Sequence, residues 1–388
     1  MNPLLDPEPQ AQRKLRVLFI LPHPIEGPSS RFRVYQFLPY LQAHGIEATV
    51  SPLLSSSLAP IVYDKGKTAQ KILLTGYGLL RRLYDVLRST RYDVVYVLRE
   101  AFPFGPPLLE RLMAAGASRM IFDYDDAIYV SSTAYTNPLD RFRDFSKTEK
   151  LIRMADHIVA GSHHLARYAA RHKPIVSCIS ILPTVVDTRD FRPPGQRHGD
   201  DFTIGWIGTP RGTAYLRSIR EAIITVSRKL PKARFVFVGA EPFDCGGVPV
   251  EFRKWTLERE IADIQSFDVG IMPLFDDEEA RGKCGFKLIA YMSAGLPVVC
   301  SPVGANKDIV SEGVNGYFAD TPEAWAKALI RLGENPLLRH QFAEQGRRHV
   351  EENFSLDVVA PRLLSILRGT PAPQNAFFAD GKMETSKP

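Results

Sequence analysis

The chain has 388 residues, of which 45% are hydrophobic and 24% charged. That length can build two domains with separate cores, and the composition excludes a fibrous or low-complexity protein. No apolar run is long enough to cross a bilayer, and residues 1–14, which we expect to form a flexible amino terminus, lack the apolar core of a signal peptide. A formal net charge of +6 allows anionic partners without selecting among nucleotide phosphates, lipid head groups and nucleic acid.

The cysteines indicate the compartment. Four cysteines occur, without the spacing of a metal site or a disulfide framework: Cys178, Cys245, Cys284 and Cys300. A reducing cytosol is the simplest interpretation, so we expect a cytoplasmic protein.

The first element is a continuous apolar run over 15–21, as expected of a central parallel strand. A turn-rich loop leads to a helix predicted over 31–43. Ser30, Arg31 and Arg33 lie where this helix begins, and the start of a helix attracts anions. The alternative is solvated arginines on an amphipathic helix.

A second strand is predicted over 46–53, and residues 64–91 then mix basic with apolar side chains. Such a stretch could lie on an anionic membrane surface. The more common alternative, which we favour here, is an amphipathic helix that packs its apolar face on the sheet.

The next two predicted strands, 92–98 and 120–122, each end in acidic residues. Glu100 follows the first strand, and the second delivers three aspartates: Asp123, Asp125 and Asp126. Carboxyl ends of parallel strands form the binding edge of a sheet. The aspartates could bind a cation, orient sugar hydroxyls or raise one another's pKa. Alternatively, they form a polar loop in which Asp126 caps a helix.

A long helix is predicted over 139–155, followed by a strand and a helix over 162–171 that carries His163 and His164. Neighbouring residues diverge by about 100° around a helix, so these two side chains cannot share one metal ion. We interpret them as surface or cleft residues.

Residues 188–201 are polar and contain two prolines and two glycines, which predicts a linker. A strand over 202–207 follows, and then a glycine turn opens a helix with Gly208, Thr209 and Arg211. The second half thus repeats the strand, loop and helix of the first half. The sequence therefore predicts an α/β protein with two facing Rossmann-like domains and a cleft between them.

A further predicted strand, 233–238, ends near Glu241, and the stretch 268–304 reads as strand, acidic loop, helix and strand. Gly282 and Gly285 would let the backbone approach a ligand. Lys283 and Lys287 would share a face if the helix begins this early, which makes a diphosphate cradle. The alternative is a loop that caps a helix, with two solvated lysines.

This stretch resembles the nucleotide-sugar signature of glycosyltransferase family 4, which is retaining and has the GT-B fold. The match is to a bacterial subgroup and runs through Gly282, Lys283, Cys284, Gly285, Phe286, Lys287, Leu288, Tyr291, Met292, Gly295, Pro297, Val298, Val299, Val303 and Gly304. The subgroup's S-x-R-x-R element matches Ser29, Arg31 and Arg33, and its D-x-D-D-A-x-Y segment matches 123–129. The resemblance covers about residues 15–368.

The resemblance implies a domain organisation. An acceptor-side domain would occupy 15–187, the linker 188–201, and a nucleotide-sugar-binding domain 202–354. A helix over 355–369 would cross back to the first domain. Residues 370–388 show no core-forming pattern, so we expect a disordered tail.

The resemblance also implies an activity: transfer of a hexosyl group from a nucleotide sugar to a glycan or lipid-linked acceptor, in cell-envelope polysaccharide synthesis at the inner face of the membrane. The expected catalytic residues are Asp123, Asp125 and Lys287. The expected donor-binding residues are Ser30, Arg31, Arg33, Gly208, Thr209, Arg211, Glu241, Lys283, Gly285, Phe286, Lys287, Val303 and Gly304. The expected acceptor-side residues are Glu100, Asp126 and His163. No cofactor, resident metal or nucleic acid is expected.

The sequence departs from the wider family at two positions. Gly282 and Ala290 stand where that family has two glutamates, the later of which contacts the ribose. This leaves two alternatives: a sugar-nucleotide epimerase of the same fold, and a non-catalytic donor-binding or scaffold protein with a degenerate site.

Overall fold

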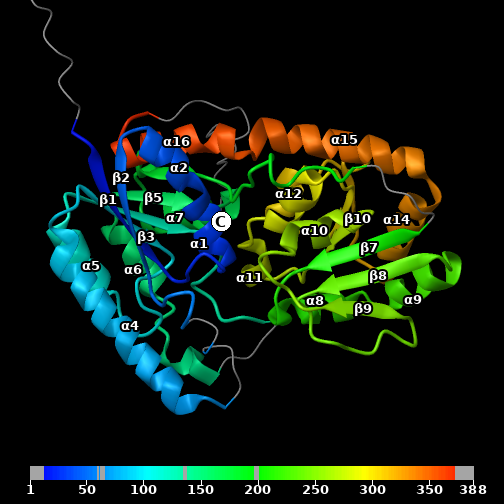
Figure 1. Ribbon diagram of the computed structural model, residues 1–388, viewed down its shortest axis with the longest axis horizontal. Helices are drawn as coiled ribbons and strands as arrows, with labels where there is room; N and C mark the ends of the chain where they lie inside the picture. The colour runs from blue at the N-terminus through cyan, green and yellow to red at the C-terminus, as the bar shows by residue number, and fades with distance from the viewer. Residues whose placement is uncertain (1–12, 59–60, 62–65, 134–137, 196–200, 372–388) are drawn as a thin grey trace, which may run out of the picture.

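The computed structural model describes residues 13–58, 61, 66–133, 138–195 and 201–371. Within these ranges two parallel sheets of six strands each lie side by side, with helices around them (Figure 1). This is the α/β arrangement of two facing domains that the sequence predicts. Parts of the expected amino terminus (1–12), linker (196–200) and tail (372–388) lie outside the described residues.

The first sheet has the order β2-β1-β3-β4-β5-β6. Its strands are β1 (Leu15–Leu21), β2 (Ile46–Pro52), β3 (Val94–Leu98), β4 (Arg119–Tyr124), β5 (His157–Ala160) and β6 (Ile179–Ile181). Strand β1 pairs with β2 on one side and β3 on the other, and its residues 17–21 are buried. The direction of the winding reverses between these neighbours, and such a switch point is where α/β sheets bind ligands.

The helices of the first half are α1 (Pro28–Arg33), η1 (Tyr35–Phe37), α2 (Leu38–Ala43), α4 (Thr68–Ser89), α5 (Leu108–Gly116), η2 (Pro138–Phe142), α6 (Lys147–Met154), α7 (His163–His172) and η3 (Val176–Cys178). The single helices predicted over 31–43 and 139–155 are both broken. Asp144 explains the second break, because its carboxylate accepts from the backbone N–H and the hydroxyl of Ser146, which favours a turn over a helix interior.

The second sheet has the order β12-β11-β10-β7-β8-β9. Its strands are β7 (Phe202–Ile207), β8 (Ala233–Val238), β9 (Val250–Arg253), β10 (Val269–Met272), β11 (Val298–Cys300) and β12 (Gly316–Phe318). The sequence analysis missed β9, a short edge strand that is only partly buried and therefore lacks a long apolar run. Strand β7 lies between β10 and β8, so this sheet has a switch point as well.

The helices of the second half are η4 (Pro210–Gly212), α8 (Thr213–Ser218), α9 (Arg220–Lys229), α10 (Glu260–Gln265), α11 (Glu278–Arg281), α12 (Phe286–Ser293), α13 (Asn306–Ile309), α14 (Pro322–Glu334), α15 (Pro336–Asn353) and α16 (Leu356–Arg368). Helices α15 and α16 run along one side of both sheets (Figure 1). Arg119 in β4 donates to the carbonyl of Ile366, and Arg368 donates to the carbonyl of His44. The last helix thus contacts the first sheet's elements.

The interior of the second sheet requires a glycine at position 205. A Cβ atom there would lie 1.9 Å from Cγ of Phe267. We expect Gly205→Ala to lower the free energy of unfolding by about 1–3 kcal/mol, because a packed core does not accept added volume. Urea unfolding measures this change.

Gly76 on α4 is the matched control, since a Cβ atom there would meet nothing within 4 Å. Gly76→Ala should stabilise the protein by about 0.5–1 kcal/mol through helix propensity. Equal effects of the two substitutions would contradict the packing of this sheet.

Candidate functional site

The loops that follow β4 and β10 meet between the two sheets. The Cys284 thiol donates to the carbonyl oxygen of Asp125 at 3.0 Å and is buried in the cluster that includes the core of the first sheet. Burial raises the pKa of this thiol well above its usual range, so it stays protonated. A Cβ atom at Gly282 would lie 2.4 Å from Cβ of Ala127, so the two loops are in close contact there.

The acidic loop of the second domain is held by side chains of the first. Glu278, at the start of α11, accepts from the Tyr129 hydroxyl at 2.9 Å and lies 3.0 Å from Nε2 of His164. The next residue, Glu279, accepts from the Ser132 hydroxyl at 2.8 Å. These contacts join segments about 115–150 residues apart in the chain.

Asp123 is placed differently from the sequence prediction. Strand β4 continues to Tyr124, two residues beyond its predicted end, so Asp123 lies within the strand and is buried. Its carboxylate accepts from Arg33 at 2.5 and 2.7 Å and from the Tyr96 hydroxyl at 2.6 Å. In this geometry the two side chains satisfy one another inside the first domain, and a part of Asp123 in catalysis or of Arg33 in donor binding stays a prediction.

Arg31 also has a protein partner. Its Nη2 lies 2.8 and 2.7 Å from the two carboxylate oxygens of Glu260 in α10, and its guanidinium stacks near the rings of Phe32 and Trp255. The pair ties the first domain to the second, and donor binding by Arg31 likewise stays a prediction. Ser30 is buried beside it, and its hydroxyl has no hydrogen-bond partner in the described part of the chain.

Asp125 and Asp126 do lie at the edge between the domains. Arg99 bridges them, with Nε 2.6 Å from Asp125 and Nη2 2.6 Å from Asp126. Burial opposes ionisation of Asp125, but Arg99 and Arg33 outweigh it and lower the pKa of this carboxyl. Arg99 has a φ of +63°, a left-handed conformation that costs free energy in a residue with a side chain. The two ion pairs hold Arg99 in that conformation.

Arg99 and His23 are site residues that the sequence analysis missed. Burial lowers the pKa of His23 to about 4, with Arg99 and Arg211 adding to the effect and Asp125 opposing it. The imidazole is therefore neutral near pH 7, between charged groups of both domains. The available signal was position, because each residue follows the end of a central strand of the first sheet.

Lys283 and Lys287 form the basic side of the site. Helix α12 begins at Phe286, so Lys283 lies in the preceding loop and the expected shared helical face is absent. The Lys287 Nζ lies 5.7 Å from the Trp206 ring centroid, and Lys283 bonds Glu279 at 3.2 Å.

The two lysines differ in their electrostatics. Burial, reinforced by the charge of Lys283, lowers the pKa of Lys287 to about 8. Burial acts on Lys283 too, but Asp126, Tyr215 and Glu279 outweigh it and raise its pKa. No hydrogen bond or ion pair joins Lys287 to any residue in the described ranges.

The glycines of this region are required by packing within the protein. A Cβ atom at Gly285, whose φ is +66°, would lie 2.2 Å from Ile309. At Gly304 it would lie 2.5 Å from the carbonyl of Arg281. In this arrangement the protein itself fills the space where a side chain would lie at Gly285 and Gly304, and a close approach of the backbone at Gly282 and Gly285 to a ligand stays a prediction.

The remaining predicted donor residues surround the end of β7. Gly208 packs against the Trp206 ring, Thr209 and Arg211 are exposed, and the backbone N–H of Glu241 donates to Thr213 at 2.9 Å. Val303 is buried, while Phe286 stacks on Phe32 of the first domain with ring centroids 4.2 Å apart.

Two predicted acceptor-side residues have protein contacts. His163 lies 3.3 Å from Asp308 of the second domain, and Glu100 faces Arg143 and Lys147 at 3.7 and 3.9 Å. In the described ranges no three His, Cys, Asp or Glu side chains are grouped so that they could hold a metal ion.

The two domains leave little space next to His163. A cavity bordered by Gly161, His163, Cys284 and Asp308 has a volume of about 20 Å³. A cavity of about 460 Å³ lies at the other end of the first sheet, beside Leu15 and Val94 where β1 and β3 begin, and none of the predicted site residues line it.

Lys287→Met should stabilise the free protein near pH 7 by about 1–3 kcal/mol, because it removes an ammonium whose burial is uncompensated. The unfolded chain keeps the lysine proton up to its ordinary pKa of 10.5, whereas the folded chain loses it near 8. The free energy of unfolding of wild type therefore rises as the pH increases from about 8 to 10.5. The stability difference between wild type and Lys287→Met becomes smaller over the same pH range. Urea unfolding near pH 7 and near pH 10 measures both effects.

The control is Lys307→Met, because Lys307 is exposed and such surface changes stay within about 0.5 kcal/mol. A Lys287→Met protein that is less stable than wild type near pH 7 would contradict the electrostatics described for this lysine.

Part of the chain is similar to known proteins. Residues 201–335 match the family described as "Glycosyl transferases group 1". Spore coat protein SA of Bacillus subtilis is 35% identical over 78 residues, which are 19% of this chain and 21% of that protein. Sulfoquinovosyl transferase SQD2 of Arabidopsis thaliana is 23% identical over 352 residues, 81% of this chain and 64% of that protein. The chain thus covers about a fifth of the length of the first relative and less than two thirds of the length of the second.

Solved structures agree on the fold. Anabaena Alr3699/HepE in complex with UDP-glucose superposes with a TM-score of 0.66 at 14% identity, over 92% of this chain and all of that one. Sucrose-phosphate synthase from Thermosynechococcus elongatus gives 0.62 at 14% identity, over 92% and 99%. The chain therefore has the GT-B fold of two Rossmann-like domains, and its residues 201–335 match the glycosyl transferases group 1 family.

Proposed function

We propose that the chain is a retaining glycosyltransferase of family 4 that moves a hexosyl group from a nucleotide sugar to a glycan or lipid-linked acceptor. The group 1 match over residues 201–335 supports donor binding by the second domain. The observation that carries the proposal is Lys287, a half-buried cation without an ionic partner in the described ranges, next to Lys283 and the end of β7. A diphosphate would supply the missing anion.

The proposed donor site lies on the second domain. Lys287, Lys283 and Arg211 would bind the diphosphate, with Gly208 and Thr209 beside it and Glu241 near the base. The remaining residues shape the loop: Gly285, Phe286, Val303 and Gly304. The same cations would stabilise the charge that develops on the diphosphate as it leaves, which is electrostatic catalysis.

In the proposed reaction the acceptor hydroxyl oxygen bonds to the anomeric carbon as the carbon–oxygen bond to the diphosphate breaks. The hydroxyl approaches on the face that the diphosphate leaves, so the sugar keeps its configuration, and the leaving diphosphate takes the hydroxyl proton. Asp125, Asp126, Arg99 and neutral His23 would face the sugar and the acceptor from the first domain. Asp123 and Arg33 become positioning residues, because they support the strand end that carries Asp125.

The setting is also part of the proposal. We place the enzyme in cell-envelope polysaccharide synthesis at the inner face of the cell membrane, with 15–187 as the acceptor-side domain and 202–354 as the donor domain. It needs no cofactor and no metal ion. No helix in the described part of the chain combines the length and apolarity needed to cross a membrane, so contact with a bilayer would be peripheral, through residues 64–91.

A donor-binding protein without transfer activity is the second candidate, and two positions favour it. Gly282 has no room for a side chain beside Ala127, and Ala290 is buried in the core. Neither can supply the carboxylate that the wider family uses at the ribose, so binding and transfer need separate assays.

A thermal-shift panel of nucleoside diphosphates and their sugar conjugates tests donor binding, because a ligand of the folded state must raise the melting temperature. We expect a shift with one base, lost in Lys287→Ala and kept in the exposed control Lys307→Ala. The panel is run with and without magnesium, and we expect the same shift in both.

Release of nucleoside diphosphate from the donor that binds, with and without membrane extract as a source of acceptor, tests transfer. Release that depends on the extract supports the transferase. A shift without release would favour the second candidate, and no shift with any nucleotide would overturn the donor site.

A further inference from the structure

Helix α4 is inverted relative to an ordinary amphipathic helix. Its polar residues Arg82 and Asp85 are fully buried against the sheet, whereas Leu73, Leu80 and Leu87 are 73%, 67% and 77% exposed. These leucines recur every seven residues and so share one face of the helix. The expectation that this stretch packs its apolar face on the sheet is therefore wrong: the apolar face points outward.

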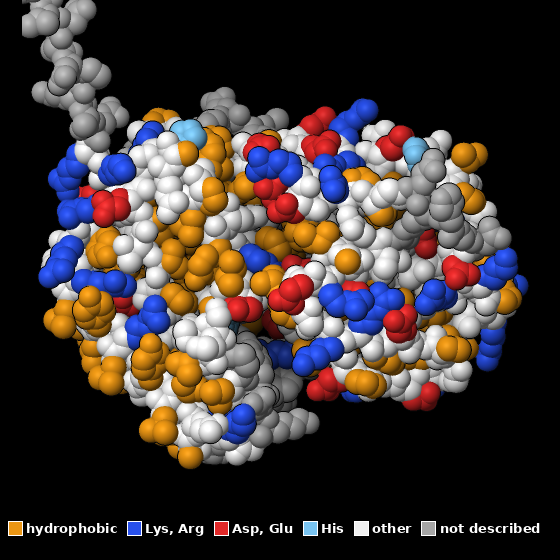
Figure 2. Space-filling model, viewed as in Figure 1, with side chains coloured by type: hydrophobic (Ala, Val, Ile, Leu, Met, Phe, Trp, Pro, Cys, Tyr) orange, Lys and Arg blue, Asp and Glu red, His pale blue; other side chains and the backbone are white. Residues whose placement is uncertain are grey.

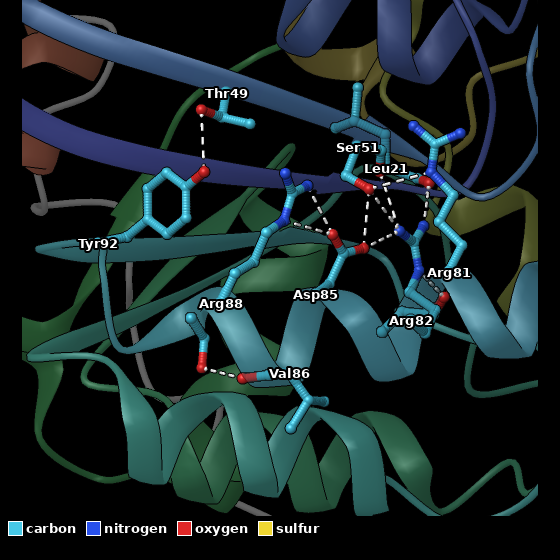
Figure 3. A network of polar contacts seen from close by, with 11 residues as sticks. Leu21, Thr49, Ser51, Arg81, Arg82, Asp85, Val86, Arg88 and Tyr92 are labelled. Atoms are coloured by element: carbon cyan, nitrogen blue, oxygen red, sulfur yellow. Dashed lines mark hydrogen bonds and ion pairs between the residues drawn. The ribbon is translucent and has the colours of Figure 1, made fainter.

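A buried polar network explains why the helix can face this way (Figure 3). Asp85 accepts from Arg82 and from the Ser51 hydroxyl, both at 2.8 Å. Arg82 also donates to the carbonyls of Leu21 at 2.7 Å and Ala101 at 2.6 Å. Because each charge is paired and hydrogen-bonded, the network can anchor α4 to the first sheet without using the helix's apolar side chains.

The apolar surface extends beyond one helix. We define the outer face of α4–α5 by its exposed side chains: Ile72, Leu73, Leu80, Leu83, Tyr84, Leu87, Leu108 and Leu112. Figure 2 shows hydrophobic side chains gathered at the lower left, over the region that α4 and α5 occupy in Figure 1. Soluble monomers rarely expose so many large apolar side chains together unless the surface binds something.

The charges around the outer face indicate the binding partner. Asp85 is the single carboxylate between residues 66 and 92, and it is buried and paired with Arg82 and Arg88. Five cations of the same stretch are at least partly exposed, namely Lys67, Lys71, Arg81, Arg88 and Arg91, whereas Arg82 is buried. An apolar face with cations and without exposed carboxylates fits an anionic lipid surface. Two copies of the chain would bring like charges together at this face, which disfavours self-association.

We propose that the outer face of α4–α5 inserts among the acyl chains at the surface of an anionic bilayer, with α4 lying in the plane of the interface. This goes beyond peripheral electrostatic contact, because the leucines and not the cations make the larger contribution. Arg82 binds the backbone at Leu21 and Ala101, each two residues from a site residue, His23 or Arg99. On the proposed function, a bilayer under α4 would place the acceptor side of the site near the lipid surface.

Flotation of the full chain with lipid vesicles tests the proposal. Wild type should float with vesicles of phosphatidylcholine and phosphatidylglycerol, and less with phosphatidylcholine alone. The combined change Leu73→Glu, Leu80→Glu and Leu87→Glu should reduce the bound fraction at least about tenfold, whereas raised salt should weaken binding only partly. The matched control is Leu337→Glu on α15, where Leu337 is 78% exposed, and it should bind as wild type does.

Wild type that does not float, or a triple variant that floats as well as wild type, would overturn the proposal. Analytical ultracentrifugation that finds wild type as a dimer and the triple variant as a monomer would also overturn it, because a second copy would then cover the outer face. Circular dichroism checks that the triple variant is folded. If the triple variant keeps the nucleotide thermal shift but no longer floats, the membrane surface and the donor site are separate. If wild type floats but no nucleotide shifts its melting temperature, the membrane proposal holds and the proposed function fails.

Discussion

The ion pair between Arg33 and Asp123 is the interaction on which the first half of the site depends. It joins α1 to β4 in a fully buried position, and Arg33 also donates to the carbonyl of Leu182 just after β6. The backbone carbonyl of Asp123 accepts from the N–H of Arg99 as well. Removing one partner of such a pair typically costs about 3–5 kcal/mol, because a buried charge is left alone. The loop that carries Asp125 and Asp126 therefore begins from a fixed strand end.

The site built on this support is divided by charge. The first domain contributes the carboxylates Asp125 and Asp126 with Arg99, and the second contributes Lys283 and Lys287. The charge of Asp126 raises the pKa of Lys283, and it opposes but does not overcome the lowering of the Lys287 pKa by burial. A diphosphate would add the negative charge that Lys287 lacks. A bound diphosphate would weaken the attraction between Asp126 of the first domain and the lysines of the second. Donor binding could change the contact between the domains in this way.

Much of the fold could be predicted from the sequence. Residues 15–21 and 233–238 are apolar runs of parallel strands, and the structure has strands at these bounds. The repeated order of strand, glycine loop and helix predicted two similar halves. The segment with Lys283 and Lys287 was predicted as a candidate site because basic residues and glycines follow a buried strand. These patterns are local in the sequence, and apolar runs of this kind predict strands that are buried in a sheet.

The partners of the charged residues could not be predicted. Glu260 lies 229 residues from Arg31, so no spacing in the sequence connects them. The burial of Asp123 depends on where β4 ends. Because the strand ends at Tyr124, two residues later than predicted, Asp123 lies inside the protein. The periodicity of α4 gave an amphipathic helix, but it could not show which face the sheet binds. That choice depends on Arg82, Asp85 and Ser51, which come together only in the folded chain.

We propose that a nucleotide sugar binds where the loops after β7 and β10 meet the first domain. Hydrogen–deuterium exchange, with and without the nucleoside diphosphate that raises the melting temperature, tests this binding site directly. We expect slower exchange at residues 206–213 and 282–288 when the nucleotide is bound. Protection confined to other segments, such as residues 13–16 and 367–369 beside the larger cavity, would contradict it.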